Sequence, residues 1–311
     1  MKTSGRIKAK IIDYTEVNAA VNQGAENYIS RCEDYYKSQI DEICEELIGR
    51  NSKIILLAGP SSSGKTTTAA RLCAGLEKRG RSGQIVSIDD FYIDRDKLPP
   101  LPDGSLDLET IEAIDVSHLR FCLDKLLNDG RADFPVFDFH RAKRLGTPQR
   151  IECGTDHVII VEGIHALNPL IVQGLDESQF FRLFISVASF YLHNEGRILL
   201  DRYELRLIRR VIRDFNYRNS TLEKTVSMWK SVRIGEKKYI SPFKPLADYF
   251  IDSLLFYEPG MFRTLFEPLF EAADKNGPYY GALESLYNQL ELFDKIPVKL
   301  VPEDSLLREF I

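Results

Sequence analysis

The segment Gly-Pro-Ser-Ser-Ser-Gly-Lys-Thr at residues 59–66 constrains the fold of this chain most strongly. It follows the apolar run 53–58 and leads into a helical pattern that continues to residue 79. Gly-x-x-x-x-Gly-Lys-Thr between a strand and a helix is the pattern of a phosphate-binding loop. Its glycines let backbone N–H groups close around phosphate oxygens, and the helix N-terminus adds partial positive charge. The segment therefore predicts a nucleoside triphosphate site in an α/β fold.

Each residue type in this loop has an expected task. Lys65 is placed to reach the β- and γ-phosphates, and Thr66 offers a hydroxyl to Mg²⁺. The alternative is a glycine- and serine-rich turn that binds nothing. The residues expected to contact ATP are Gly59, Ser61, Ser62, Ser63, Gly64, Lys65, Thr66 and Thr67.

Strand-like and helical patterns alternate beyond the loop. Residues 66–79 carry a stripe of apolar side chains at helical spacing, and Gly80 ends it. Further strands are expected at 84–88, 157–161, 181–187 and 247–251, whereas residues 98–104 contain three prolines and predict a loop. This order predicts the P-loop NTPase fold, with a mostly parallel sheet flanked by helices.

The flanks of this core are helical in pattern. We expect a helical N-terminal extension at 1–50, the P-loop core at 51–257 and a helical C-terminal appendage at 258–311. Apolar residues recur at helical spacing from Tyr36 to Ile48, and aromatic residues recur from Phe262 to Phe270.

Composition excludes several classes of protein. A net charge of −5 argues against general affinity for nucleic acid. No apolar run approaches the length of a membrane span, so no membrane partner is expected. The five cysteines are widely spaced without Cys-x-x-Cys, which predicts neither a zinc site nor a disulfide framework and suits the reducing cytoplasm. Assembly into a homo-oligomer is left open.

Two of the expected strands end in acidic residues. Asp89 follows the strand at 84–88, and Glu162 follows the strand at 157–161. Because ligands bind beyond the carboxyl ends of parallel strands, both acids are expected beside the phosphate loop. We expect Asp89 to accept the proton of the attacking hydroxyl and to reach the metal, and Glu162 to hold Mg²⁺ directly or through water. For either acid alone, a solvated turn or a helix N-cap is the alternative.

Arginines gather between residues 197 and 220. Arg206, Arg210 and Arg213 fall on one helix face, which suits the oxygens of a transferring phosphoryl group. This segment is expected to be a lid, with Arg210 and Arg213 in catalytic roles and Arg206 and Arg209 binding ATP. A partner surface or a nucleic-acid patch is the alternative.

Five segments occur in a recognisable order. They are Gly-Pro-Ser-Ser-Ser-Gly-Lys-Thr-Thr (59–67), Ser-Ile-Asp-Asp-Phe-Tyr (87–92), Pro-Val-Phe-Asp-Phe (135–139), Val-Glu-Gly-Ile (161–164) and Arg-Arg-Val-Ile-Arg-Asp (209–214). Together they resemble the uridine kinase and phosphoribulokinase family of P-loop kinases. The ending at 301–311 resembles that of a bacterial uridine kinase-like group, in which the kinase often follows a domain related to threonyl-tRNA synthetase N-termini. No such preceding domain is expected here.

The resemblance implies that Asp89 is the catalytic base, that Glu162 serves Mg²⁺ and that residues 209–214 belong to the lid. Positions that read the pyrimidine in uridine and cytidine kinases depart from the family, since Phe137, Ala142 and Met228 stand where tyrosine, histidine and glutamine would. Glu109 lies nearest the ribose-binding aspartate of the family. The residues expected to bind the acceptor are Tyr92, Glu109, Phe137, Asp138, Arg144 and Arg218.

The sequence thus predicts an ATP- and Mg²⁺-dependent kinase with a small hydroxyl-bearing substrate, foremost a nucleoside such as uridine or cytidine. A kinase of another sugar or polyol is one alternative, because the base-reading positions are changed. A module that binds ATP without turnover is another, although such a sensor would not need a base at Asp89. The chain has no Asn-Lys-x-Asp segment for reading guanine, which disfavours a GTPase.

Overall fold

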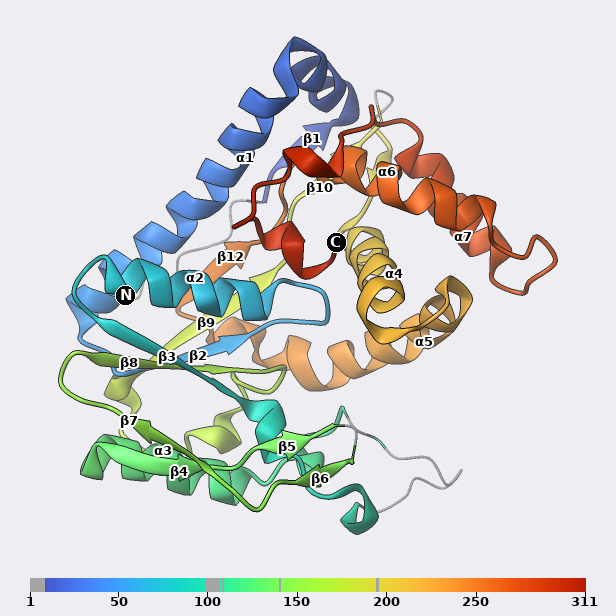
Figure 1. Ribbon diagram of the computed structural model, residues 1–311. Helices are drawn as coiled ribbons and strands as arrows, with labels where there is room; N and C mark the ends of the chain where they lie inside the picture. Colours follow the sequence, from blue (N-terminus) through green and yellow to red (C-terminus); the bar gives the residue numbers. More distant parts are fainter. Residues whose placement is uncertain (1–8, 99–106, 108, 140, 194–195) are drawn as a thin grey trace.

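A five-stranded sheet forms the centre of the molecule (Figure 1). The structure is a computed structural model that describes residues 9–98, 107, 109–139, 141–193 and 196–311, so most of the loop expected at 98–104 lies outside it. All four strand pairings in this sheet are parallel, which confirms the predicted α/β fold. The strand order is β12 (Tyr249–Asp252), β9 (Phe180–Ser186), β2 (Ile54–Ala58), β8 (His157–Glu162) and β3 (Ser82–Ser87).

Strand β2 is buried along its whole length and divides the core in two. Because successive side chains point to opposite faces of a strand, Ile55 and Leu57 pack on one side and Ile54 and Leu56 on the other. Helices α1 (Tyr14–Arg50) and α2 (Lys65–Glu77) cover the first side, and α3 (Val116–Asp129) covers the second (Figure 1). The sheet is thus the middle of three layers, and the phosphate loop leaves it at the end of β2.

The N-terminal segment is mostly one long helix, as expected, with helical dihedral angles interrupted at Gly24. It begins with a short strand that the sequence pattern did not predict. This strand, β1 (Ile11–Asp13), pairs in parallel with β10 (Phe190–Leu192), which pairs with β11 (Ile198–Leu200). A chain segment some 180 residues away therefore supplies the pairing partner, which local pattern cannot reveal.

Helix α4 (Arg202–Arg218) occupies the segment expected to be the lid. A capping box of Asp201 and Glu204 starts it, because each side chain accepts a hydrogen bond from the backbone of the other residue. Helix α5 (Leu222–Gly235), one π-helical turn (Glu236–Ile240) and a 3₁₀ segment (Ser241–Leu246) lead back to the sheet. Two small hairpin-like pairs lie near α3, namely β4 (Arg131–Phe134) with β7 (Gln149–Glu152) and β5 (Phe137–Asp138) with β6 (Lys143–Arg144).

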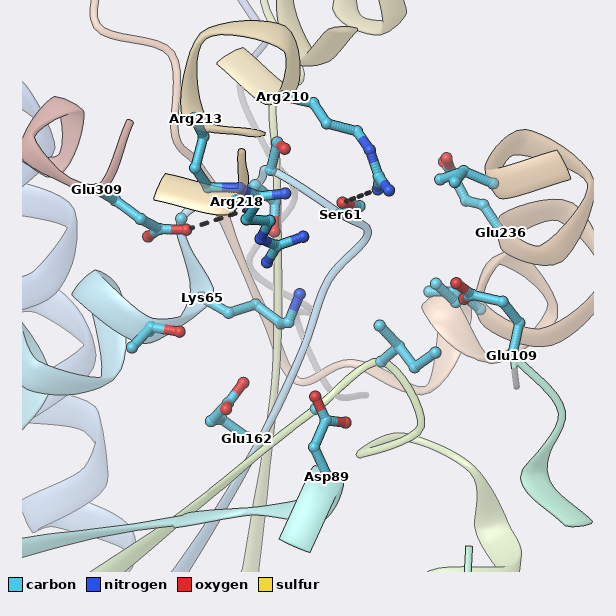
Figure 2. A pocket seen from close by; sticks show the side chains of 18 of the residues that line it. Ser61, Lys65, Asp89, Glu109, Glu162, Arg210, Arg213, Arg218, Glu236 and Glu309 are labelled. Carbon is cyan, nitrogen blue, oxygen red and sulfur yellow. Dashed lines mark hydrogen bonds and ion pairs between the residues drawn. The ribbon is translucent and has the colours of Figure 1, made fainter. Parts of the chain in front are cut away.

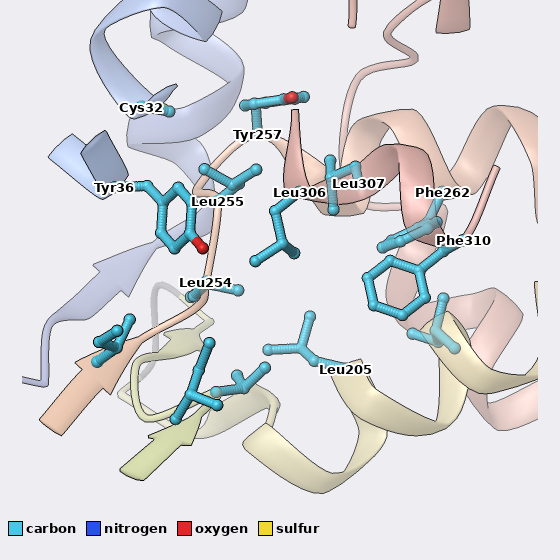
Figure 3. Close-up of a cluster of buried hydrophobic side chains, with 14 of the residues drawn as sticks. Cys32, Tyr36, Leu205, Leu254, Leu255, Tyr257, Phe262, Leu306, Leu307 and Phe310 are labelled. Atoms are coloured by element: carbon cyan, nitrogen blue, oxygen red, sulfur yellow. The ribbon is translucent and has the colours of Figure 1, made fainter. Parts of the chain in front are cut away.

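The C-terminal part contains α6 (Glu258–Glu271), α7 (Tyr280–Leu290) and two 3₁₀ turns, Val298–Leu300 and Leu306–Glu309. The last turn packs into the core between α1, α4 and α6 (Figure 3). Leu306, Leu307 and Phe310 are fully buried in one cluster with residues of α1 and of β2. The division into an extension, a core and an appendage remains a prediction, and the buried cluster is continuous across all three.

Candidate active site

The phosphate loop has the backbone shape of an anion cradle. Ser62 and Gly64 both have positive φ, at 57° and 86°, in a loop that leads directly into α2. Alternation of left-handed and right-handed residues turns successive N–H groups to one side, which makes an anion-binding concavity. Gly59 allows a close approach to the neighbouring strand, because a Cβ there would lie 2.3 Å from the carbonyl oxygen of Ile185. The buried hydroxyls of Ser62 and Ser63 have no hydrogen-bond partner among the described residues.

A cavity of about 300 Å³ lies over this loop (Figure 2). Strands β2, β8 and β3 are neighbours in the sheet, so the loop after β2, Glu162 at the end of β8 and Asp89 just after β3 meet at one edge. The expected convergence of three strand ends is therefore what the structure shows. The lining residues are Ser61 to Thr66, Asp89, Tyr92, Glu109, Glu162 to Ile164, Arg210, Arg213, Arg218, Val232, Glu236, Ile240 and Glu309.

Ser87 connects the Glu162 carboxylate with the backbone of Asp89. The Ser87 hydroxyl donates a hydrogen bond to Oε1 of Glu162 at 3.0 Å and accepts one from the Asp89 backbone N–H at 3.3 Å. Burial, together with the nearby negative charge of Glu162, raises the pKa of Asp89 to about 6, although Lys65 opposes the shift. A carboxylate with a pKa close to the working pH is suited to accept a proton from a substrate hydroxyl.

Lys65 extends into the middle of the cavity (Figure 2). Its ammonium group donates a hydrogen bond to the carbonyl oxygen of Pro60 at 3.3 Å. Burial lowers the pKa of Lys65, and the negative charges of Glu162, Glu309 and Asp89 oppose that shift. Lys65 is therefore influenced by carboxylates from three segments, namely the end of β8, the turn after β3 and the C-terminal turn.

Three arginines of α4 line the cavity and share one buried carboxylate. Asp214 lies within 3.3 Å of Arg210, 3.2 Å of Arg213 and 3.3 Å of Arg218. Arg210 also donates to the Ser61 hydroxyl at 2.8 Å, which ties the helix to the phosphate loop (Figure 2). The sequence pattern marked the arginines as a group but not Asp214 as the residue that orients them.

Arg206 and Arg209 differ from the expectation that they face the triphosphate. Both side chains are buried, and neither lines the cavity. Arg206 donates to the carbonyl oxygen of Ser61 at 2.9 Å and pairs with Glu236 at 3.0 Å. Arg209 donates to the carbonyl oxygen of Ser62 at 3.3 Å. The guanidinium groups hold the phosphate loop from behind, because the face of α4 that carries them turns toward the protein interior.

Arg209 and Glu258 form a fully buried ion pair with two hydrogen bonds, at 3.0 and 2.6 Å. Arg209→Met is expected to lower the free energy of unfolding by about 3 kcal/mol, because it leaves the Glu258 carboxylate buried without its partner. Urea denaturation measures this change. The control is Arg202→Met, an exposed arginine of the same helix, where the expected change is within about 0.5 kcal/mol. Equal stability of the two variants would contradict a structural role for Arg209.

The residues expected to bind the acceptor fall into two groups. Tyr92, Glu109 and Arg218 line the cavity, whereas Phe137, Asp138 and Arg144 do not. Phe137 is buried behind Tyr92, with ring centroids 5.8 Å apart. Arg144 donates to the carbonyl oxygens of Phe91 and Tyr92, so it supports the segment that carries Tyr92.

Two residues expected to contact ATP lie outside the cavity, and two residues that line the cavity were not predicted from the sequence. The Thr67 hydroxyl donates to Glu309 at 2.9 Å, and Thr67 and Gly59 do not line the cavity. Glu236 and Glu309 line it without any signal in the local sequence. Within the described part of the chain, no helix is both long and apolar enough to cross a membrane.

Comparison with known proteins matches residues 54–256 to the model of the phosphoribulokinase/uridine kinase family. The uridine kinase of Bacillus subtilis (strain 168) is 25% identical over 205 residues, which is 66% of this chain and 87% of that protein. The uridine kinase of Macrococcus caseolyticus is 29% identical over 199 residues, or 64% and 86% of the two chains.

Among solved structures, the fold is similar to a putative fructose transport system kinase from Silicibacter sp. TM1040. The TM-score is 0.51 at 19% identity, over 68% of this chain and 98% of that one. Because the family model matches more than half of the residues, and includes the phosphate loop, both carboxylates and α4, the chain belongs to the phosphoribulokinase/uridine kinase family of phosphotransferases that act on an alcohol group.

Proposed function

We propose that the protein transfers the γ-phosphoryl group of ATP to a hydroxyl of a nucleoside of the uridine or cytidine type. One observation carries the proposal: Lys65, Asp89 and Glu162 line a single cavity between the phosphate loop and the arginines of α4. Phosphoryl transfer needs little beyond positioning, charge neutralisation and a group that orients the nucleophile. Each of these requirements has a candidate side chain in the cavity.

The proposed reaction breaks one bond and forms one. The acceptor hydroxyl gives its proton to the Asp89 carboxylate, and its oxygen bonds to the γ-phosphorus. The bond from that phosphorus to the bridging oxygen breaks, and ADP leaves. Lys65, Arg210 and Arg213 are placed to stabilise the charge on the migrating group, and the loop N–H groups hold the remaining phosphates.

The donor groups at the cavity fit Mg²⁺. This ion prefers oxygen ligands and is usually held by one or two protein groups together with substrate phosphates. The Thr66 hydroxyl and the Glu162 carboxylate line the cavity, and Ser87 fixes only Oε1 of Glu162. Thr66 and Glu162 would hold the ion, with Asp89 close to it, and the ion would neutralise charge on the β- and γ-phosphate oxygens.

The nucleoside is favoured by the relatives and by the aromatic residues on the acceptor side. Tyr92 lines the cavity, and the buried Phe137 ring packs against it with ring centroids 5.8 Å apart. The Tyr92 ring, supported in this way, is the aromatic face on which a base can stack. Glu109 lines the same cavity and is available to accept hydrogen bonds from ribose hydroxyls.

A sugar or polyol is the second candidate, and a specific observation favours it. Besides Glu109, the cavity is lined by the charged side chains of Glu236, Arg210 and Arg218, which suit a ligand with several hydroxyl groups. Met228 is exposed on α5 and does not line the cavity, so it supplies no group there that reads a base. A site without groups that read a base discriminates weakly among bases.

A screen of ADP release decides between these acceptors. Uridine, cytidine, purine nucleosides, hexoses and small polyols are each incubated with the protein, ATP and MgCl₂. We expect uridine or cytidine to stimulate ADP release by at least about tenfold over the acceptor-free rate, because a bound hydroxyl replaces water as the nucleophile. Stimulation by hexoses or polyols alone would overturn the nucleoside assignment and keep the kinase.

A further inference from the structure

The C-terminal turn lies along one face of α2, next to the phosphate loop. A Cβ at Gly64 would lie 2.5 Å from a methyl group of Leu306, so the two segments are in direct contact. Three residues further along α2, the Thr67 hydroxyl donates to the Glu309 carboxylate at 2.9 Å. One turn further, Arg71 pairs with Asp304 at 3.0 Å. The tail thus follows the first turns of the helix whose N-terminus faces the expected phosphates.

The Glu309 carboxylate points into the cavity among its cationic groups (Figure 2). One oxygen accepts the hydrogen bond from Thr67, and the other lies 4.0 Å from the Arg213 guanidinium. Its charge also acts on Lys65, where burial lowers the pKa and Glu309 is among the groups that oppose the shift. Lys65 and Arg213 are proposed above to stabilise the migrating phosphoryl group, and Thr67 is expected from the sequence to contact ATP.

The backbone that carries Glu309 is firmly held. Leu306, Leu307 and Phe310 on either side of it are fully buried (Figure 3). The Phe310 ring lies 5.2 Å from the Arg209 guanidinium, and Asn216 of α4 donates to the Phe310 carbonyl oxygen at 3.3 Å. The carboxylate is therefore kept at the phosphate site by packing, and only its side chain is free to turn away.

We infer that Glu309 is an internal anion that competes with the triphosphate of ATP for Thr67, Arg213 and Lys65, and so sets the affinity for nucleotide. The inference rests on the proposed function in one respect, namely that polyphosphate binds at residues 59–67. A carboxylate and a phosphate offer the same kind of acceptor oxygen to hydroxyl, ammonium and guanidinium donors. In the free protein Glu309 offsets part of the positive charge of the site, and a bound polyphosphate has to displace it.

The test compares binding of tripolyphosphate and of ATP by calorimetry in the wild type and in Glu309→Gln. Glutamine keeps the size of the side chain but removes its charge, so tripolyphosphate and ATP are each expected to bind about tenfold more tightly. Glu309→Ala, which removes the side-chain contact as well, is expected to tighten binding at least as much. The control is Glu303→Gln, which removes the same charge from an exposed position of the same tail, and it is expected to leave both affinities within about twofold.

Weaker or unchanged binding in both Glu309 variants would overturn the inference, since the side chain would then help to hold the nucleotide or be indifferent to it. A wild type and variants that all fail to bind tripolyphosphate would overturn it as well. The probe carries no acceptor, so failure of the acceptor screen alone removes the proposed nucleoside kinase activity and leaves the result on Glu309 standing. Thermal unfolding of each variant verifies that it is folded.

Discussion

Asp89→Asn is expected to lower kcat about a thousandfold and to leave the affinity for ATP within about threefold of the wild type. Asparagine keeps the size of the side chain but cannot accept the hydroxyl proton. The effect is expected on kcat because Asp89 is the proposed base, whereas the phosphate loop, which is proposed to hold ATP, is unchanged. Steady-state rates with the best acceptor from the screen, together with calorimetry of ATP binding, measure the two effects separately.

Two further variants make this result specific. Asp96→Asn removes an exposed carboxylate a few residues along the chain and is expected to retain full activity. Glu162→Gln is expected to weaken the affinity for Mg²⁺, so that the lost activity is partly restored at higher MgCl₂, since Glu162 is the proposed ligand of the ion. If the Asp89→Asn variant kept more than a tenth of the wild-type kcat, Asp89 could not be the catalytic base.

Local sequence was sufficient to predict the part of the site that the sheet builds. Strands β2 and β8 contain short apolar runs, whereas β3 reads Ser-Gly-Gln-Ile-Val-Ser, and the catalytic candidates lie at the end of each strand or within two residues of it. In a parallel sheet the carboxyl ends of neighbouring strands lie at one edge, so sequence position already fixes where Asp89 and Glu162 come together. The order of neighbours β2, β8 and β3 brings both acids to the phosphate loop.

The roles of the arginines were predictable only in part. Helical spacing predicted Arg206, Arg210 and Arg213 on one face of α4, whereas only Arg210 and Arg213 line the cavity and Arg206 turns inward. That is decided by Glu258 and Glu236, whose carboxylates come from distant segments and draw Arg209 and Arg206 inward. As a result, Arg206 and Arg209 of α4 bind the backbone of the phosphate loop from the protein interior, and other arginines of α4 line the cavity on the opposite side of the loop.

The contribution of the C-terminus could not be predicted from local pattern. Glu309 lies 242 residues from Thr67 in the sequence, and Phe137 and Arg144 stand behind Tyr92 instead of in the cavity. Contacts of this kind depend on how complete elements pack, and they leave no periodic signal in the chain. The positions expected to bind the acceptor depend largely on such contacts, so local sequence predicted them less well than the phosphate loop.

Lys65→Met is expected to lower kcat about a thousandfold, because the site loses the positive charge placed at the migrating phosphoryl group. Methionine keeps the length of the apolar stem, and burial already disfavours the charged form of Lys65, as its lowered pKa indicates. Folding stability is therefore expected to change by no more than about 1 kcal/mol, which separates the loss of catalysis from a loss of structure. Steady-state kinetics and urea denaturation on the same preparation measure both quantities.

Lys78→Met is the matched control, because Lys78 is exposed at the opposite end of the same helix. Its kcat is expected to equal that of the wild type. The two variants differ only in which end of α2 loses its charge, so a large difference between them assigns the effect to the helix N-terminus and the phosphate loop. If Lys65→Met instead kept kcat and raised only KM for ATP, the lysine would contribute equally to binding of the ground state and of the transition state. The arginines of α4 would then have to stabilise the charge on the migrating phosphoryl group.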